Sequence, residues 1–242
     1  MRAQEEGQSM DITIPRVKIC CIRSTQEAWL AIRYGAAALG LVSAMPSGPG
    51  VIPEAQIAAI AAAIPPAVAS FLLTSQQDPA TIIAQQRRCR VNTIQLCDRL
   101  APDSYQTLRA ALPGIALVQV VHVTGEAAIA EALSVAPHVD GILLDSGDPS
   151  LPIKQLGGTG RVHNWQISRR IRDLVPVPVF LAGGLHAGNI AEAVRLVRPF
   201  GVDVCTGVRT NGALDEARLA AFFGALRAMH PMGDRVHAQL EV

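Results

Sequence analysis

Three apolar segments of this chain end in residues that can carry out acid–base chemistry or bind an anion. Cys20, Asp145 and the pair Gly183-Gly184 each come directly after a short apolar run. A carboxylic acid can donate a proton, a thiolate can accept one, and backbone N–H groups at glycines can approach phosphate oxygens closely. The pattern therefore predicts an acid, a base and an anion-binding loop.

Asp145 is the strongest of these candidates, because a carboxylate directly after Ile142-Leu143-Leu144 is out of place in a core. To donate a proton near neutral pH, its pKa must lie well above the ordinary value of about 3.9, which requires burial. The alternative is a carboxylate that only caps a neighbouring loop or helix.

The elements that must position these residues form a regular pattern, in which short apolar segments alternate eight times with helical segments. Strands are expected at residues 16–22, 37–43, 67–74, 93–97, 115–123, 141–146, 178–184 and 202–207. Helices are expected at residues 24–34, 53–64, 79–89, 103–112, 125–136, 165–174, 187–197 and 215–229. Strands that are apolar nearly throughout are typical of a parallel sheet covered by helices. The alternation predicts an α/β fold, a single-domain (β/α)8 TIM barrel, with an open doubly wound sheet as the alternative.

In such a barrel the active site lies at the carboxyl ends of the strands. That rule brings Cys20 from the first strand and Asp145 from the sixth strand to one mouth. Glycines follow the sixth, seventh and eighth strands in turn, at Gly157, Gly158, Gly160, Gly183, Gly184 and Gly207. Phosphate sites in these barrels use the loops after strands seven and eight, so the three sets predict a bound phosphate rather than tight turns alone.

Cys20 taken alone could be a small core residue. The two-residue period of a strand places Lys18 on the same face, where its ammonium could favour a thiolate or form an ion pair inside the barrel. His122, His163, Cys97 and Asp98 also lie near the mouth, but their spacing matches no metal-ligand pattern. We therefore expect neither a metal nor a cofactor.

Composition limits the remaining choices. The 242 residues carry a net charge of +1 without a basic stripe, which argues against nucleic acid as the main partner. The most apolar stretch, residues 57–74, is interrupted by Pro65-Pro66 and predicts no membrane span.

We expect a flexible N-terminal tail at 1–13, the barrel at 14–229 and a C-terminal tail at 230–242. Monomer and homodimer both stay open.

The five cysteines include no CxxC pair and no framework of paired spacings. Cys20 and Cys21 are adjacent, so they are expected on opposite faces of a strand and not to form a disulfide. The cysteines therefore predict free thiols and a reducing, cytoplasmic setting.

Several motifs, in order from about residue 17 to residue 223, resemble the phosphoribosylanthranilate isomerase family. They are Lys18-Ile19-Cys20, residues 35–41, Gln95-Leu96, Leu143-Leu144-Asp145, Gly157-Gly158-Thr159-Gly160 with Trp165, Ala182-Gly183-Gly184-Leu185 with Asn189, and residues 198–203 with Gly207-Val208. The resemblance implies an aldose–ketose isomerase that acts by an Amadori rearrangement in the third step of tryptophan biosynthesis, without metal or cofactor. It implies Cys20 as general base, Asp145 as general acid, and Asp203 with the glycines as residues that bind the phosphorylated sugar.

The chain departs from the family pattern at the position that meets the anthranilate carboxylate. The family usually has Ser-x-Arg after the second strand, whereas Pro49 holds the arginine's position here. Loss of such a guanidinium costs about 1.5–3 kcal/mol if nothing replaces it. Arg209 or Arg23 is the hypothesised replacement. Cys21 stands where the family usually has a glycine.

Two other functions stay open at this point. One is a related phosphosugar isomerase or epimerase whose acceptor lacks the carboxylate, which Pro49 favours. The other is a non-catalytic barrel that binds a phosphorylated ligand. The presence of both Cys20 and Asp145 weighs against the second, because a pure binding protein needs neither.

Overall fold

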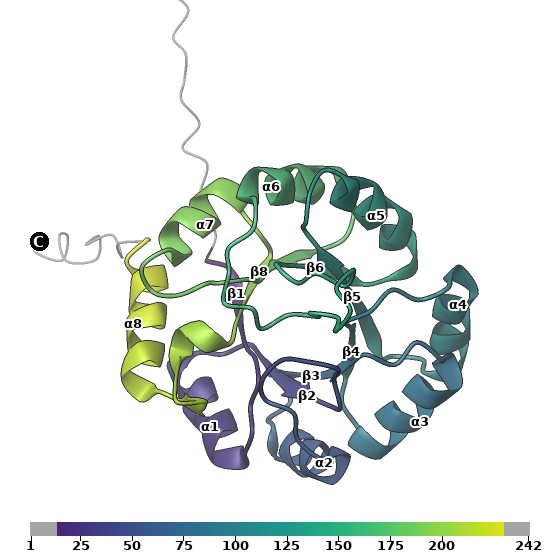
Figure 1. The fold of residues 1–242 in the computed structure, drawn as a ribbon. Helices are drawn as coiled ribbons and strands as arrows, with labels where there is room; N and C mark the ends of the chain where they lie inside the picture. The colour runs from purple at the N-terminus through teal and green to yellow at the C-terminus, as the bar shows by residue number, and fades with distance from the viewer. Residues whose placement is uncertain (1–13, 230–242) are drawn as a thin grey trace, which may run out of the picture.

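The computed structural model describes residues 14–229, which form a closed barrel of eight parallel strands inside a ring of eight helices (Figure 1). The strands are β1 (Arg16–Ile19), β2 (Ala38–Val42), β3 (Ala69–Thr74), β4 (Thr93–Leu96), β5 (Ala116–His122), β6 (Gly141–Asp145), β7 (Val179–Leu181) and β8 (Gly201–Val204). The helices are α1 (Thr25–Tyr34), α2 (Glu54–Ala63), α3 (Pro79–Cys89), α4 (Pro102–Ala111), α5 (Ala127–Val135), α6 (Trp165–Leu174), α7 (Ile190–Val197) and α8 (Glu216–Arg227).

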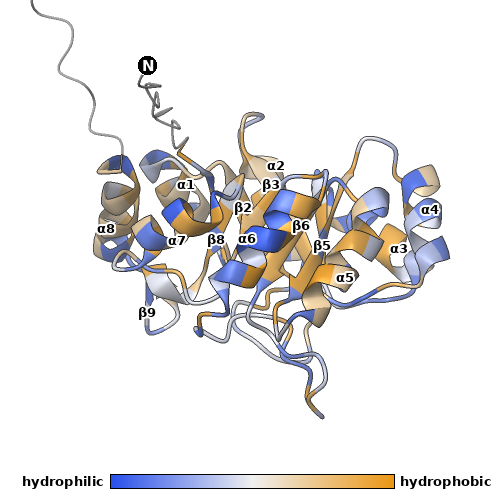
Figure 2. Cartoon of the chain, turned by 90° about the horizontal axis from the view of Figure 1, so that it is seen from above, coloured by the Kyte–Doolittle hydropathy of each residue, from blue (hydrophilic) through white to orange (hydrophobic). Residues whose placement is uncertain are grey.

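The predicted (β/α)8 barrel is confirmed, and the open sheet is excluded because β1 pairs with β8. All eight strands are buried along nearly their whole length, as their continuous apolar runs predict. Long loops project from one end of the barrel, at the carboxyl ends of the strands (Figure 2). The two predicted tails lie outside the described residues.

Local signals in the sequence explain where several helices begin and end. Ser24 caps α1 by accepting a hydrogen bond from the N–H of Glu27, and Gly35 ends the helix in the left-handed conformation. Asn164 caps α6 in the same way as Ser24 caps α1. Within residues 14–229, no helix has the length and apolar character needed to cross a bilayer.

Two details differ from the expected elements. The first strand ends at Ile19 rather than Ile22, because Cys21 adopts a left-handed backbone with φ of +63°. After β8, a short helical turn η2 (Thr206–Val208) leads into a hairpin of β9 (Arg209–Thr210) and β10 (Ala213–Leu214). Two-residue strands carry too little periodicity to be recognised in a sequence.

The barrel interior contains a buried ion pair at the seam where the barrel closes. Lys18 on β1 and Asp203 on β8 are register partners, and Lys18 Nζ lies 2.7 Å from Asp203 Oδ2. Lys18 is fully buried, and its ammonium lies 5.3 Å from the ring centre of Phe71. Burial alone would lower the pKa of Lys18, but attraction to Asp203 and Cys20 raises it above its ordinary value, so the lysine stays charged.

We expect Lys18→Met to lower the free energy of unfolding by about 3–5 kcal/mol, because it leaves the buried Asp203 carboxylate without its partner. Urea denaturation measures this difference. The control is Arg170→Ala, which removes an ion pair with Glu126 between side chains that are both more than half exposed. That change is expected to cost less than about 1 kcal/mol. Equal losses in the two variants would contradict the assignment.

Candidate active site

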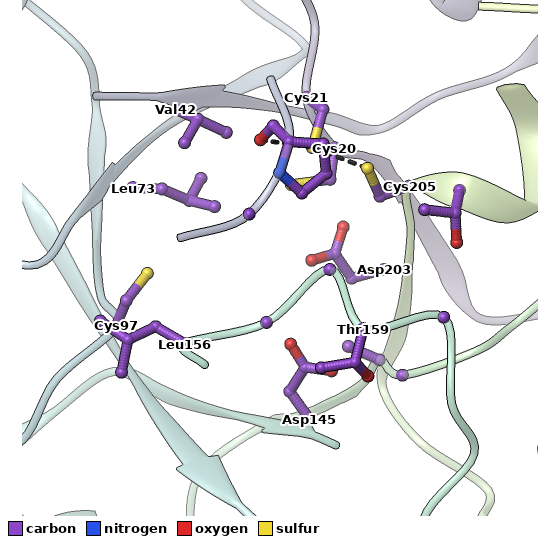
Figure 3. A pocket seen from close by; sticks show the side chains of 18 of the residues that line it. Cys20, Cys21, Val42, Leu73, Cys97, Asp145, Leu156, Thr159, Asp203 and Cys205 are labelled. Carbon is purple, nitrogen blue, oxygen red and sulfur yellow. Dashed lines mark hydrogen bonds between the residues drawn. The ribbon is translucent and has the colours of Figure 1, made fainter. Parts of the chain in front are cut away.

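A pocket opens at the carboxyl ends of the strands, where the predicted site residues converge (Figure 3). It encloses about 690 Å³ including its open mouth. Predicted site residues that line it are Cys20, Asp145, Gly157, Gly158, Gly160, Gly183, Gly184 and Asp203. Figure 3 shows Cys20 and Asp145 on opposite sides of the pocket, with Asp203 between them.

Cys20 is held at the end of β1 by a hydrogen bond from its N–H to the carbonyl of Val204 on β8. Its thiol lies near the Lys18 ammonium, with both groups packed against Gly40: a Cβ atom at that glycine would lie 2.8 Å from Cys20 Sγ and 3.0 Å from Lys18 Nζ. A hydrogen bond from the Cys21 thiol lowers the pKa of Cys20, burial raises it, and Lys18 lowers it again. The net pKa lies below the ordinary thiol value, which favours a thiolate.

Asp145 ends β6 and is about 9% exposed. Burial raises the pKa of Asp145 above its ordinary value, against the opposing effect of the Ser146 N–H, which donates to Oδ1 at 2.7 Å. Gly157 covers the other carboxylate oxygen so closely that a Cβ atom at position 157 would lie 2.5 Å from Asp145 Oδ2. The carboxyl group is therefore held in conditions that favour its protonated form.

Two residues that line this pocket carry a buried oxygen with no hydrogen-bond partner among residues 14–229. Asp203 uses Oδ2 to pair with Lys18, whereas its Oδ1 atom is one of the two unpaired oxygens. The other is the Oε1 atom of Gln95 on β4. Because a buried acceptor without a donor costs free energy, both atoms are suited to accept hydrogen bonds from hydroxyl groups of a bound molecule.

The glycines after β6 and β7 bring backbone to the pocket wall in conformations that side chains rarely adopt. Gly160, Gly183 and Gly184 have φ of +67°, +81° and +63°. At Gly184 a Cβ atom would lie 2.7 Å from the carbonyl carbon of Arg161. The loop after β6 and the loop after β7 can therefore pack together only through a glycine at position 184.

Gly207 was expected to line the phosphate site, but it does not border the pocket. A Cβ atom there would lie 2.0 Å from the carbonyl oxygen of Leu185. A glycine is required at position 207 because η2 packs closely against the loop after β7. The neighbouring Thr206, which the sequence did not single out, lines the pocket instead.

Arg209 was a hypothesised partner for a substrate carboxylate, and the structure corrects this. Its guanidinium lies outside the pocket and donates to the carbonyls of Cys20 and Cys21, to the carbonyl of Gly212 and to both carboxylate oxygens of Glu27. The side chain is 5% exposed. Arg209 therefore braces the end of β1 and the hairpin through both terminal nitrogens of its guanidinium. Its buried Nε has no hydrogen-bond partner among the described residues.

Cys21 also differs from expectation, because its side chain lines the same pocket as Cys20 rather than the opposite face of a strand. The positive φ at Cys21 breaks the strand alternation and turns the thiol back toward the pocket. The glycine usual at this position in the resembled family would have signalled such a conformation. All five cysteines are unbridged.

The loops after β2 and β6 meet over the pocket. Ser47 Oγ donates to the carbonyl of Lys154 at 2.6 Å, and Pro49 packs against Gly158. Figure 1 shows the loop after β6 crossing the barrel mouth. Among residues 14–229, none of the side chains that line this pocket belongs to a lysine or an arginine.

Comparison with known proteins decides the family. The family model described as N-(5'phosphoribosyl)anthranilate (PRA) isomerase matches residues 17–225, which is nearly the whole described barrel. The chain belongs to this family. An N-(5'-phosphoribosyl)anthranilate isomerase of Methanocella arvoryzae is 33% identical over 208 residues, covering 86% of this chain and 95% of the relative.

Solved structures of the PRA isomerase family share the fold. The phosphoribosyl anthranilate isomerase of Thermus thermophilus is 25% identical with a TM-score of 0.75, covering 89% of this chain and 100% of that chain. Another, at 26% identity and a TM-score of 0.71, covers 88% of this chain and 99% of its own. That protein was solved in complex with reduced 1-(o-carboxyphenylamino)-1-deoxyribulose 5-phosphate.

We expect alkylation of Cys20 by iodoacetamide to have its midpoint below pH 8.5, the ordinary pKa of a thiol, because the Cys21 thiol and Lys18 favour the thiolate. Peptide-resolved mass spectrometry across a pH series measures this midpoint. Cys89 is the internal reference, since burial raises its pKa to about 11. The same midpoint for both cysteines would rule out a thiolate-stabilising site around Cys20.

Proposed function

We propose that this protein isomerises N-(5'-phosphoribosyl)anthranilate to 1-(o-carboxyphenylamino)-1-deoxyribulose 5-phosphate, the third step of tryptophan biosynthesis from anthranilate. Membership of the PRA isomerase family supports this reaction. The observation that carries the assignment to residues is the placement of Cys20 and Asp145 on opposite sides of one pocket with a glycine-rich wall. An Amadori rearrangement needs an acid, a base and a site for the phosphate.

Asp145 is the proposed general acid. In its protonated form it donates to the ring oxygen of the ribose, and the ring opens to a Schiff base between the former anomeric carbon and the anthranilate nitrogen. Burial keeps a proton on this carboxyl group at higher pH than an exposed aspartate would retain it, because the buried carboxylate is poorly solvated. The close approach of Gly157 leaves no room for a side chain beside Asp145 Oδ2.

Cys20 is the proposed general base. As a thiolate it removes the proton from C2 of the Schiff base, giving an enolamine that tautomerises to the ketose. The reaction needs the thiol deprotonated while the carboxyl group is protonated. The lowered pKa of Cys20 and the raised pKa of Asp145 bring the two titrations closer together, which increases the fraction of molecules in this working state.

Asp203 and Gln95 are proposed to bind the ribose hydroxyl groups through their unpaired oxygens. The loops at Gly160, Gly183 and Gly184 are proposed to bind the phosphate, with the hydroxyl of Thr206. The partner is thus a small phosphorylated sugar and not a nucleic acid. Five unbridged thiols support a cytoplasmic setting.

We expect Asp145→Asn to lower kcat by at least about 10²-fold, because an amide cannot protonate the ring oxygen. The measurement is steady-state fluorescence of phosphoribosylanthranilate consumption. The matched control, Asp173→Asn, removes a carboxylate on the outer face of α6 that pairs with Arg169, and its kcat should stay at the wild-type value. An Asp145→Asn variant with wild-type turnover would refute the acid.

Gly184→Ala should weaken the binding of inorganic phosphate by at least about tenfold, because its Cβ would displace the backbone at Arg161. Isothermal titration calorimetry measures the Kd. Gly114→Ala is the matched control, since Gly114 also has a positive φ, of +81°, but meets nothing within 4 Å. Equal phosphate affinity in both variants would show that the loop after β7 does not bind phosphate.

The substrate carboxylate is expected to contribute little to recognition, because no lysine or arginine side chain lines the described pocket. This observation favours, as a second candidate, an isomerase that accepts phosphoribosylamines without the carboxylate. We expect kcat/KM for phosphoribosylaniline to lie within about tenfold of that for phosphoribosylanthranilate, since a charge-assisted hydrogen-bond pair would be worth more. A preference above about 10³-fold for the carboxylate would show that a cation reaches the substrate.

A further inference from the structure

Two cysteines that the proposed mechanism does not use as acid or base lie in contact beside the active site. The thiol of Cys205 donates to Cys21 Sγ, and the two sulfur atoms are 2.7 Å apart (Figure 3). Cys21 lies just beyond β1, and Cys205 directly follows β8. A disulfide bond is about 2.05 Å long, so the sulfurs need to approach by only about 0.7 Å to bond.

The backbone explains this proximity. β1 and β8 are adjacent strands, with Ile19 paired to Val204 and the N–H of Cys20 bonded to the Val204 carbonyl. This register places Cys205 opposite Cys20, so Cys21 is one residue further along β1's direction and diagonal to Cys205. The left-handed conformation of Cys21 then places its thiol on the pocket side, beside Cys205.

The two thiols differ in how a reagent can reach them. Cys21 is 4% exposed, whereas Cys205 is partly exposed. Both cysteines border the active-site pocket and a second cavity of about 480 Å³, which Arg23 and Arg209 also line. A small molecule can therefore approach the more exposed Cys205 from either cavity, with the Cys21 sulfur 2.7 Å away from it.

We propose that Cys21 and Cys205 form a reversible dithiol–disulfide couple at the rim of the active site, oxidised by low-molecular-weight disulfides. The Cys205 thiolate attacks one sulfur of the small disulfide, forms a mixed disulfide and expels one small thiol. The Cys21 sulfur then attacks Cys205 Sγ, forms the protein disulfide and expels the second small thiol. The two cysteines lose two electrons and two protons, and the small disulfide gains them as two thiols.

Oxidation has a direct consequence for the neighbouring base, which rests on the proposed function. In the dithiol form the Cys21 thiol lowers the pKa of Cys20, because a hydrogen offered to the Cys20 sulfur stabilises the thiolate. A sulfur in a disulfide has no hydrogen to donate, so the Cys20 thiolate loses that stabilisation. The Cys21 thiol also contacts the Pro49 carbonyl in the loop after β2 at 3.6 Å, and bonding to Cys205 breaks this contact.

The test uses the full chain, equilibrated with bis(2-hydroxyethyl) disulfide and 2-mercaptoethanol at a series of ratios. We expect two of the five thiols to be lost, a peptide linked through Cys21 and Cys205 in the mass-spectrometric map, and recovery of both thiols in excess 2-mercaptoethanol. Cys205→Ser should form no such link. The matched control Cys89→Ser, which changes a buried cysteine on α3, should form the link as the wild type does.

A Cys205 that carries only the mixed disulfide while Cys21 stays free would overturn the proposal. So would a wild-type protein that loses no thiols, or a link between Cys20 and Cys21. Turnover of phosphoribosylanthranilate at neutral pH is expected to fall by up to about tenfold as the linked fraction rises, which is the size of effect expected when the base loses one hydrogen bond. An active enzyme that forms no link refutes the couple alone, whereas a linked protein whose reduced form is inactive refutes the proposed function alone.

Discussion

The buried ion pair between Lys18 and Asp203 is the interaction on which both the closed barrel and the candidate site depend. It joins β1 to β8, the two strands whose pairing turns an open sheet into a barrel. It also fixes charge beneath the pocket, since the Lys18 ammonium lies near Cys20 and is held there by Asp203. Replacing either residue alone by a neutral one would leave the other charge buried without a partner. The stability of the barrel and the stabilisation of the Cys20 thiolate thus depend on the same two side chains.

The end of β1 is held by contacts that have little to do with the chemistry itself. Arg209 donates to the carbonyls of Cys20 and Cys21, and Glu27 holds the guanidinium in place. Burial raises the pKa of Glu27, but hydrogen bonds from Arg209 and from the Leu214 N–H lower it overall, so the carboxylate stays charged. This bracing holds a non-glycine residue in a left-handed conformation. The position of Cys20 therefore depends on contacts of Arg209 and Glu27 outside the pocket as well as on contacts inside it.

The order of elements could be predicted from the sequence, whereas several side-chain roles could not. The strands and helices can be predicted from residues that are neighbours in the sequence. Examples are the apolar run before Asp145 and the helix-capping pair Ser24 and Glu27. The role of Arg209 depends on Glu27, which is 182 positions away in the chain. No local sequence pattern shows that these two residues meet in the fold. An arginine in a loop near the mouth of the barrel was therefore interpreted as a ligand of the substrate.

The same reasoning applies to Gly207 and Cys21. Gly207 resembles a phosphate-loop glycine in the sequence, and only the carbonyl of Leu185, from the loop after β7, shows why a side chain is excluded there. The apolar run that contains Cys21 predicts a continuing strand, because nothing adjacent in the sequence signals the positive φ that the residue adopts. Both errors come from treating backbone conformation as local when a neighbouring strand or loop decides it.

The contact between the loops after β2 and β6 has a consequence for the shape of the pocket. Ser47 donates to the carbonyl of Lys154, and Pro49 packs against Gly158. Both loops also line the pocket, so each loop holds the other in place as part of the same wall. The form of that wall thus depends on a polar contact that touches neither the thiol nor the carboxyl group.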